Sequence, residues 1–396
     1  MPRNRVIYQS EALFNTKDTV DVTSSTNPPN QSGALYINQF SRVQSCNYNF
    51  NVARQDVNQF GDLAAIDRVI LEQPTVGLDF TYLLNDMHNE KALGFAVIQD
   101  QNVITGVARS NANQTALSGI LTSGFVNTKN YFIRTVSEGN DASSFGSDSA
   151  SNAVSSTIGI GNGFITNYTV NAAVGEFPNA SVSIEALNMN FSPGNSGTAP
   201  GVTASGTSVF VNTATGVFWL PQASTNPNTE NNLGRVSALR PGDVTLTLTR
   251  TTGTLYGGVD ITQAAALQNF SISLALDRTP LSKLGSRYAF SREINFPVNL
   301  TLSCTALVQD LTTGNLVDLV DNDSTYDAVI KLATPVSIST GQEGIGYVVK
   351  RLSLDSQDFS SSIGANKEVT LNFSTQIGSP QQNDRGLFMF ETLPLN

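Results

Sequence analysis

The chain of 396 residues contains an internal repeat, in which two stretches 224 positions apart share one layout. The apolar alternation of the two stretches is in phase, which is strand patterning with one buried face: Cys46, Tyr48, Phe50 and Val52 stand opposite Phe270, Ile272, Leu274 and Leu276. One structural unit is therefore expected to be used twice. Eight residues are identical without a gap: Gly33, Ile37, Gln44, Arg54, Gly61, Ala65, Arg68 and Ile70 match Gly257, Ile261, Gln268, Arg278, Gly285, Ala289, Arg292 and Ile294.

Composition indicates an all-β protein with little helix. Only 14% of the residues are charged and 40% are hydrophobic. Val, Ile, Phe and Thr dominate the patterned runs, while Ser, Thr, Asn and Gly supply most of the rest, as in short strands joined by turns. The sequence therefore predicts two tandem β-sandwich or barrel domains related by duplication.

The repeat sets the expected domain boundaries. Residues 1–190 form the first domain, 191–235 a linker or insert with a hairpin, and 236–396 the second domain. Residues 137–163 have few apolar side chains to offset their ordering entropy, so they are predicted to be a long surface loop or a docking arm. The glycine clusters at 159–163 and 344–346 are interpreted as turns, because neither follows the strand-then-helix pattern of a phosphate loop.

Both copies carry a connection of about 20 residues between their two best strands, and this is too long for a hairpin turn. The connection is expected to project from the sandwich or to cover a sheet edge. Downstream of this connection, we align Pro74 of the first copy with Pro297 of the second after dropping one residue. We align Val76 with Val298 after dropping a second residue.

Two arginines recur in this connection at fixed spacing, in a chain that is otherwise poor in charge. The repetition suggests that each makes the same contact twice, either to a carboxylate across a subunit boundary or to carbonyls of the connection itself. An intramolecular clamp is the alternative. The candidate assembly contacts are Arg54, Arg68, Arg278 and Arg292.

The charge balance excludes several classes of partner. A net charge of -10 with 22 basic residues argues against a surface that grips nucleic acid, since that affinity comes from Lys and Arg. We also find no run of about 18 apolar residues and no strongly amphipathic helix, so no membrane partner is expected. The first residues lack the apolar core of a secretory signal, so we expect synthesis in a cytoplasm.

The sequence offers no recognisable catalytic or metal-binding constellation. His88 is the single histidine, and Cys46 and Cys304 are the two cysteines, at positions that are not equivalent in the two copies. The cysteines are interpreted as small buried hydrophobes. One histidine and two dispersed cysteines are too few for a transition-metal site with the usual number of ligands. We therefore predict no catalytic residue, no metal and no cofactor.

One acidic cluster faintly matches a calcium loop. The sixth position counted from Asp321 is Tyr326, where a calcium loop has glycine, and the twelfth is Leu332, where it has a bidentate glutamate. A solvated turn is therefore the favoured interpretation. The cluster comprises Asp318, Asp321, Asp323 and Asp327.

A tandem β unit without chemistry suggests a part in an assembly. Units joined head to tail close a ring, and each neighbour then pairs the exposed sheet edge of the next. If six units close the ring, three chains suffice.

Several short motifs resemble the tail tube proteins, or major tail proteins, of long-tailed bacteriophages of the duplicated-domain type. One is Arg-Val-Gln-Ser at 42–45, which opens a strand, and another is Lys-Leu-Gly-Ser-Arg at 283–287, leading to Arg292. Asn-Phe-Pro-Val at 295–298 enters the next strand, and residues 164–185 contain Val-Gly-Glu-Phe-Pro at 174–178. The resemblance covers about half of the chain.

The resemblance implies a structural virion protein that self-assembles into stacked rings, with β-sandwiches whose strands line a channel. It implies homotrimeric, pseudo-hexameric rings and a long loop, here 53–74 and 277–297, that contacts the next ring. The implied partners are further copies of the chain and other tail proteins, such as the tail tip and terminator. DNA would transit the lumen without specific binding, and the protein would reside in the virion tail after assembly in the host cytoplasm. An acidic chain suits a lumen that must release DNA.

Two other functions are compatible with the sequence. A tandem β-sandwich adhesin or receptor-binding module would use its Ser- and Asn-rich loops with Trp219 or Tyr256 to contact glycans. A carboxylate-based glycosidase is the enzymatic alternative, since Asp and Glu are plentiful.

Overall fold

The computed structural model describes most of the strands and the connections between them. The described residues are 11–16, 37–71, 74–84, 86–99, 115–122, 129–136, 138, 142, 155–192, 239, 244–252, 266–281, 283–285, 291–308, 324–333, 344–361, 366–379, 382 and 384–392. Trp219, Tyr256, Asp318, Asp321 and Asp323 lie outside them, as do most of the expected linker 191–235 and most of 137–154.

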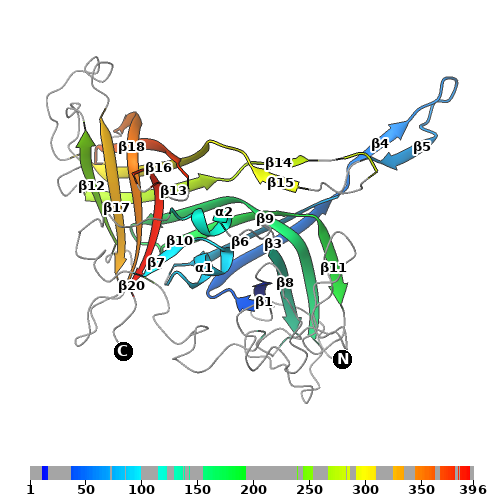
Figure 1. Ribbon diagram of the computed structural model, residues 1–396, viewed down its shortest axis with the longest axis horizontal. Helices are drawn as coiled ribbons and strands as arrows, with labels where there is room; N and C mark the ends of the chain where they lie inside the picture. Colours follow the sequence, from blue (N-terminus) through cyan, green and yellow to red (C-terminus); the bar gives the residue numbers. More distant parts are fainter. Residues whose placement is uncertain are drawn as a thin grey trace.

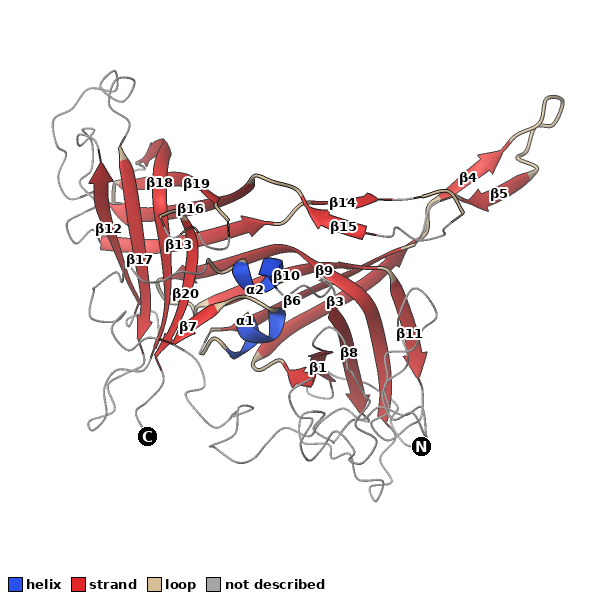
Figure 2. Cartoon of the chain, in the orientation of Figure 1, coloured by secondary structure: helices blue, strands red, loops and turns tan. Residues whose placement is uncertain are grey.

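Long strands and two short helices make up the described residues, so the predicted all-β fold is confirmed (Figure 2). The elements up to residue 192 are β1 (Glu11–Thr16), β2 (Ile37–Gln39), β3 (Val43–Asn51), β4 (Arg54–Val57), β5 (Asp67–Ile70), β6 (Thr75–Leu83), α1 (His88–Leu93), β7 (Val97–Gln99), α2 (Ser118–Thr122), β8 (Lys129–Val136), β9 (Ser155–Ala173), β10 (Asn179–Ala186) and β11 (Asn188–Ser192). Those that follow are β12 (Val244–Thr252), β13 (Ala266–Ala275), β14 (Arg278–Leu281), β15 (Ser291–Ile294), β16 (Val298–Leu307), β17 (Thr325–Ala333), β18 (Gly344–Ser360), β19 (Glu368–Ile377) and β20 (Gly386–Thr392).

The strand pairing of the first copy, β1 to β11, is repeated in the second copy, β12 to β20. In the first copy the long strand β9 pairs with β8 and β11 near its start and with β10 near its end, and β10 leads on to β6 and β3. In the second copy β18 pairs in the same way with β17, β20 and β19, and β19 leads to β16 and β13. Asn162 and Arg351, at equivalent positions of the two long strands, even share a positive φ of 56° and 57°.

The pairing corrects the sequence alignment downstream of the long connection. Phe50 lies opposite Val76, and Leu274 lies opposite Leu300, so the offset of β6 and β16 is the same 224 positions as upstream. The two expected deletions are therefore wrong. Because together they shift the alignment by two residues, they leave the alternation in phase and the sequence pattern could not reveal the error.

The two copies are joined through one continuous sheet, because β13 of the second copy pairs antiparallel with β9 of the first (Figure 1). The strand order is β12-β17-β18-β19-β16-β13-β9-β10-β6-β3. One apolar cluster spans both copies and includes Leu78 and Val182 of the first copy and Ile272 and Leu302 of the second.

A segment between β6 and β8 fastens the first copy to the second. It contains α1, β7 and α2, which lie between the two halves of the molecule in Figure 1. β7 pairs with β20 of the second copy, the backbone N–H of Ala116 donates to the carbonyl of Leu387 at 2.7 Å, and Lys91 forms an ion pair with Glu391. These contacts add to the β13–β9 ladder at the joint.

A buried carboxyl lies at the same joint. Glu90 of α1 is fully buried, and its Oε1 accepts hydrogen bonds from the hydroxyls of Tyr82 (2.8 Å) and Tyr168 (3.0 Å). The Tyr168 hydroxyl is also 3.1 Å from that of Tyr347, in β18 of the second copy. Burial raises the pKa of Glu90 to about 7.

The glycine clusters lie in strands and not in turns. β9 begins at Ser155 and β18 at Gly344, so residues 155–163 do not belong to the surface loop predicted for 137–163. At Gly163 the strand packs too tightly for a side chain. A Cβ there would lie 2.8 Å from both Tyr131 Cε2 and Ile184 Cγ2.

Gly163→Ala should therefore destabilise the protein by about 1–3 kcal/mol, because the added methyl group overpacks the core. Urea unfolding of the purified protein measures the change. Gly175→Ala is the comparison variant: no atom lies near the added methyl group, although the φ of 86° adds backbone strain. A Gly163→Ala protein as stable as the wild type would contradict the packing argument.

Candidate assembly surfaces

The inner strands of the long sheet have one apolar and one polar face. On β6 the apolar face carries Val76, Leu78, Phe80 and Tyr82, all at most 2% exposed. The opposite face consists mainly of Ser, Thr and Asn, as two equivalent rows show: Asn47, Asp79, Ser183 and Asn167 in the first copy, and Ser271, Ser303, Asn372 and Ser356 in the second.

The charged residues on this polar face are all acidic. This holds for the paired positions of the inner strands, which are β3, β6, β10, β13, β16, β19 and the second halves of β9 and β18. The acidic residues are Asp79, Glu185, Asp358 and Glu368. Neither Lys nor Arg occurs at these positions. Glu185 is paired with Arg292, whereas the other three carboxylates form no ion pair within the described part of the chain and repel phosphate groups.

Several strand edges have no partner strand among the described residues, including those of β12 and β11, and two of the unpaired edges correspond to strands that pair at the internal joint. One is β3, at the end of the strand order, and the other is the outer edge of β18 along residues 354–360. They are the counterparts of β13 and β9, the two strands that pair at the joint within the chain. Both kinds of edge that pair at the internal joint are therefore also present in unpaired form.

Apolar side chains at these two edges are exposed, although their counterparts at the internal joint are buried. Phe50 on β3 is 64% exposed, whereas the equivalent Leu274 on β13 is 0% exposed. Phe359 on β18 is 46% exposed, whereas the equivalent Val170 on β9 is buried. The internal joint shows what covers such positions, namely another copy of the same unit.

The long connections are two-stranded hairpins that project from the sheet, one of the two arrangements expected from the sequence (Figure 1). β4 pairs with β5, and β14 pairs with β15, in the same register: Arg54 lies opposite Ile70, and Arg278 opposite Ile294. Each tip contains a glycine with positive φ, Gly61 (102°) and Gly285 (81°), a conformation that other residues rarely adopt.

Arg278 and Arg292 hold the β14–β15 hairpin against the first copy. Arg292 is 8% exposed and forms an ion pair with Glu185 of β10. Both guanidinium groups lie over the ring of Phe164, with Cζ 5.0 Å (Arg278) and 5.7 Å (Arg292) from the ring centroid. Arg278 also donates to the backbone carbonyl of Arg292 at 3.1 Å, and burial lowers its pKa to about 10.

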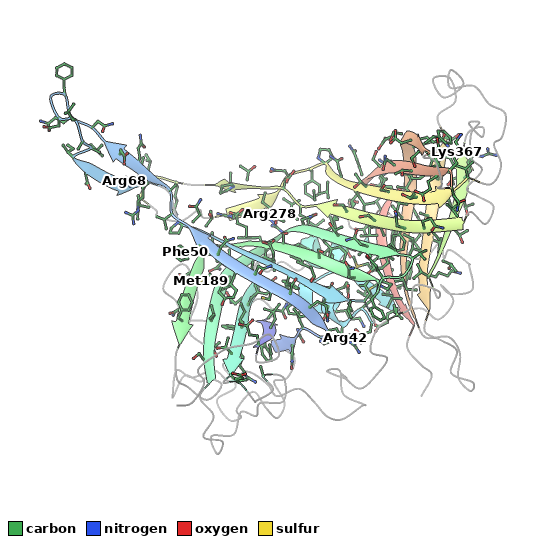
Figure 3. The ribbon with its side chains drawn as sticks, turned by 180° about the vertical axis from the view of Figure 1, so that it is seen from behind. Arg42, Phe50, Arg68, Met189, Arg278 and Lys367 are labelled. Atoms are coloured by element: carbon green, nitrogen blue, oxygen red, sulfur yellow. The ribbon has the colours of Figure 1, made fainter. Side chains whose placement is uncertain are left out.

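Arg54 and Arg68 lie in the other hairpin and do not contact the sheet in this way. Arg68, on the outlying hairpin in Figure 3, is 67% exposed and pairs with Asp56 across the hairpin, with Nε 2.6 Å from Oδ1. Arg54 is exposed and forms no ion pair within the described part of the chain. The two arginine pairs thus sit at equivalent positions but have different partners.

The sequence did not identify Phe164, which both Arg278 and Arg292 contact, or Glu185, which pairs with Arg292. Glu185 is the one charged residue in an alternating strand, and that is a weak signal. Its partner lies 107 positions away, so no local pattern could link them.

The described residues show no group of three or more His, Cys, Asp or Glu side chains that could hold a metal ion. Burial raises the pKa of both Cys46 and Cys304 to about 12, so neither thiol is an activated nucleophile. His88 opens α1, and its Nε2 lies 3.3 Å from the carbonyl of Gln39. No helix among the residues described has the length and apolar character needed to cross a membrane.

Comparison with known proteins found no matching family model and no matching curated protein. Among solved structures, a chain of "Virion of native gene transfer agent (GTA) particle" is similar at a TM-score of 0.21 and 13% identity, covering 38% of this chain and 98% of that one. A chain of "Tail of empty GTA particle computed with helical refinement, C6 symmetry" is similar at a TM-score of 0.19 and 15% identity, covering 32% and 92% respectively. TM-scores this low do not establish a shared fold.

Proposed function

We propose that this protein is a structural virion protein that self-assembles into the stacked rings of a phage tail tube. The observation that carries the proposal is the internal joint, which pairs β13 with β9 while leaving their counterparts β3 and β18 unpaired and apolar. When β3 of one chain pairs with β18 of the next in the register of the internal joint, Tyr48 lies opposite Phe359 and Phe50 opposite Gln357. Each chain then continues the sheet of its neighbour.

This contact is head to tail, and its repetition closes a ring when the rotation from one chain to the next is a whole fraction of a full turn. Each chain supplies two units, and a ring of six units is a homotrimer with pseudo-sixfold symmetry. The proposed units are residues 1–190 and 236–396, with 191–235 as the linker or insert between them. Closure pairs the β3 edge of each chain with the β18 edge of the next, and exposed edges of this kind are otherwise a liability for uncontrolled aggregation.

The polar face lines the lumen of the proposed ring, because the apolar core covers the other face of the sheet. Uncharged hydroxyl and amide groups with scattered carboxylates let a DNA duplex pass without ion pairs that would hold it. The protein therefore acts as a conduit and not as an enzyme, and it uses no cofactor. Its other proposed partners are tail proteins at the two ends of the tube, such as the tip and the terminator. Its proposed location is the virion tail, after assembly in the host cytoplasm.

Negative-stain electron microscopy of the expressed full-length protein tests the proposal. We expect rings or tubes with threefold symmetry and six similar lobes around a central hole. Sedimentation over a range of protein concentrations gives the stoichiometry independently. A protein that stays strictly monomeric at high concentration would contradict the proposal.

A further inference from the structure

We propose that the two hairpins have different tasks: β14–β15 is a clamp within the chain, and β4–β5 is the arm that binds a second copy of this chain in a neighbouring ring. The inference rests on the proposed function. It predicts contacts between rings that repeat three times around the axis instead of six.

The roots of the two hairpins have different surroundings. In the clamp, Ile294 is 6% exposed and Arg292 reaches Glu185 of the first copy. In the arm, the equivalent Ile70 is 45% exposed and Arg68 is retained by Asp56 within the hairpin.

Ring closure does not turn the arm into a second clamp. Phe164 lies opposite Glu185 in the β9–β10 ladder, and Ser353 lies opposite Ser374 in the matching β18–β19 ladder. In the next chain, Ser353 and Ser374 therefore occupy the positions of Phe164 and Glu185. Neither an aromatic ring nor a carboxylate is present there to receive the arginines.

The two hairpins also differ in the residue that lies opposite the second arginine. Asp56 lies opposite Arg68, whereas Pro280 occupies the same place opposite Arg292. In the arm, Arg68 pairs with Asp56 of the same hairpin, and the surface proposed to lie beside it has no carboxylate at the equivalent place. In the clamp, Arg292 pairs with Glu185 of the neighbouring surface, and the hairpin itself has no carboxylate at that place. The roots of the two hairpins are thus matched to two different environments.

At two equivalent positions the arm is apolar where the clamp is polar. Val69 and Leu71 in the arm correspond to Glu293 and Asn295 in the clamp. All the described residues of the arm from Arg54 to Leu71 are exposed, including the large apolar side chains of Val57, Phe60, Leu63, Ile66, Val69, Ile70 and Leu71. An isolated two-stranded hairpin is marginally stable in water, so this surface needs a partner.

A second copy of the chain is the occupant that the structure favours. The equivalent hairpin already lies on another copy of the same unit, so the arm continues a kind of contact that exists within the molecule. The arm also extends well beyond the sheet, away from the edge of its own copy (Figures 1 and 3), where it can reach a different ring.

Matched substitutions at the two hairpin tips test the division. Phe60→Asp in the arm and Leu284→Asp in the clamp place the same charge at equivalent, fully exposed positions. We expect Phe60→Asp to form single rings that no longer stack into tubes, and Leu284→Asp to form tubes of wild-type length, measured by electron microscopy and sedimentation. The double variant Val69→Glu/Leu71→Asn, which gives the arm the residues of the clamp, should also lose stacking.

Each other outcome rejects a specific claim. Rings of Phe60→Asp that stack like the wild type, or equal loss of stacking in Phe60→Asp and Leu284→Asp, would overturn the division of tasks while leaving the ring proposal intact. Absence of rings in the wild type would overturn the proposed function itself, and the division with it. Ring formation by a variant also shows that it has folded.

Discussion

Phe50→Asp is expected to abolish ring formation while leaving the monomer folded. Phe50 is 64% exposed in the single chain, so the monomer loses little. In the proposed ring the side chain takes the place that Leu274 has at the internal joint, where exposure is 0%. Removing a buried Phe costs about 1.5–3 kcal/mol and burying an unpaired carboxylate adds several more, so association should weaken at least about 100-fold.

The matched control for this experiment is Asn49→Asp, next to Phe50 on the same strand. Asn49 belongs to the polar face, opposite Gly77, so the same charge there points toward water both before and after assembly. Sedimentation velocity at several concentrations measures association, and circular dichroism measures folding. If Phe50→Asp assembles like Asn49→Asp, the β3 edge is not the contact between chains.

The contrast between Phe50 and Leu274 also shows how far sequence alone could go. Identical spacing and alternation predicted equivalent strands, and the structure has them. The alternation could not show that one strand is covered and the other free, because that depends on which strand lies beside it. The β13–β9 ladder brings together residues about 100 positions apart, and no local pattern encodes such a pairing.

The glycine-rich start of β9 was missed for a different reason. Glycine has no side chain, so residues 159–163 carry little alternation to read. The close approach of Tyr131 that requires Gly163 is a tertiary contact. The helices α1 and α2 span six and five residues, shorter than the window over which a helical period can be recognised.

The arginines are an intermediate case. Repetition singled out all four positions, because a charge kept at fixed spacing in a weakly charged chain is unusual. Repetition could not identify their partners, since Glu185 has Ser374 as its counterpart and the contact itself is not repeated. The assembly roles of the four arginines remain predictions.

The buried Glu90 should make the stability of the folded chain depend on pH. Its pKa is raised to about 7 in the folded protein from an ordinary value of 4.5, so the folded state binds the proton more tightly than the unfolded state. The contribution of Glu90 to stability is therefore greatest below pH 4.5, falls as the pH rises toward 7, and is lowest above 7. The full change is about 3 kcal/mol.

Glu90→Gln removes this dependence, because the amide has no charge to desolvate and keeps an oxygen that accepts from the hydroxyls of Tyr82 and Tyr168. We expect the free energy of unfolding of the variant, relative to wild type, to increase by about 2–3 kcal/mol between pH 5 and pH 8. Urea unfolding at both pH values measures the difference, in which the contributions of all other carboxyls cancel. Glu176→Gln, at an exposed position, controls for the substitution itself. An equal difference at both pH values would show that Glu90 is charged throughout, and the tyrosine hydroxyls would then have to stabilise a buried carboxylate at the joint between the copies.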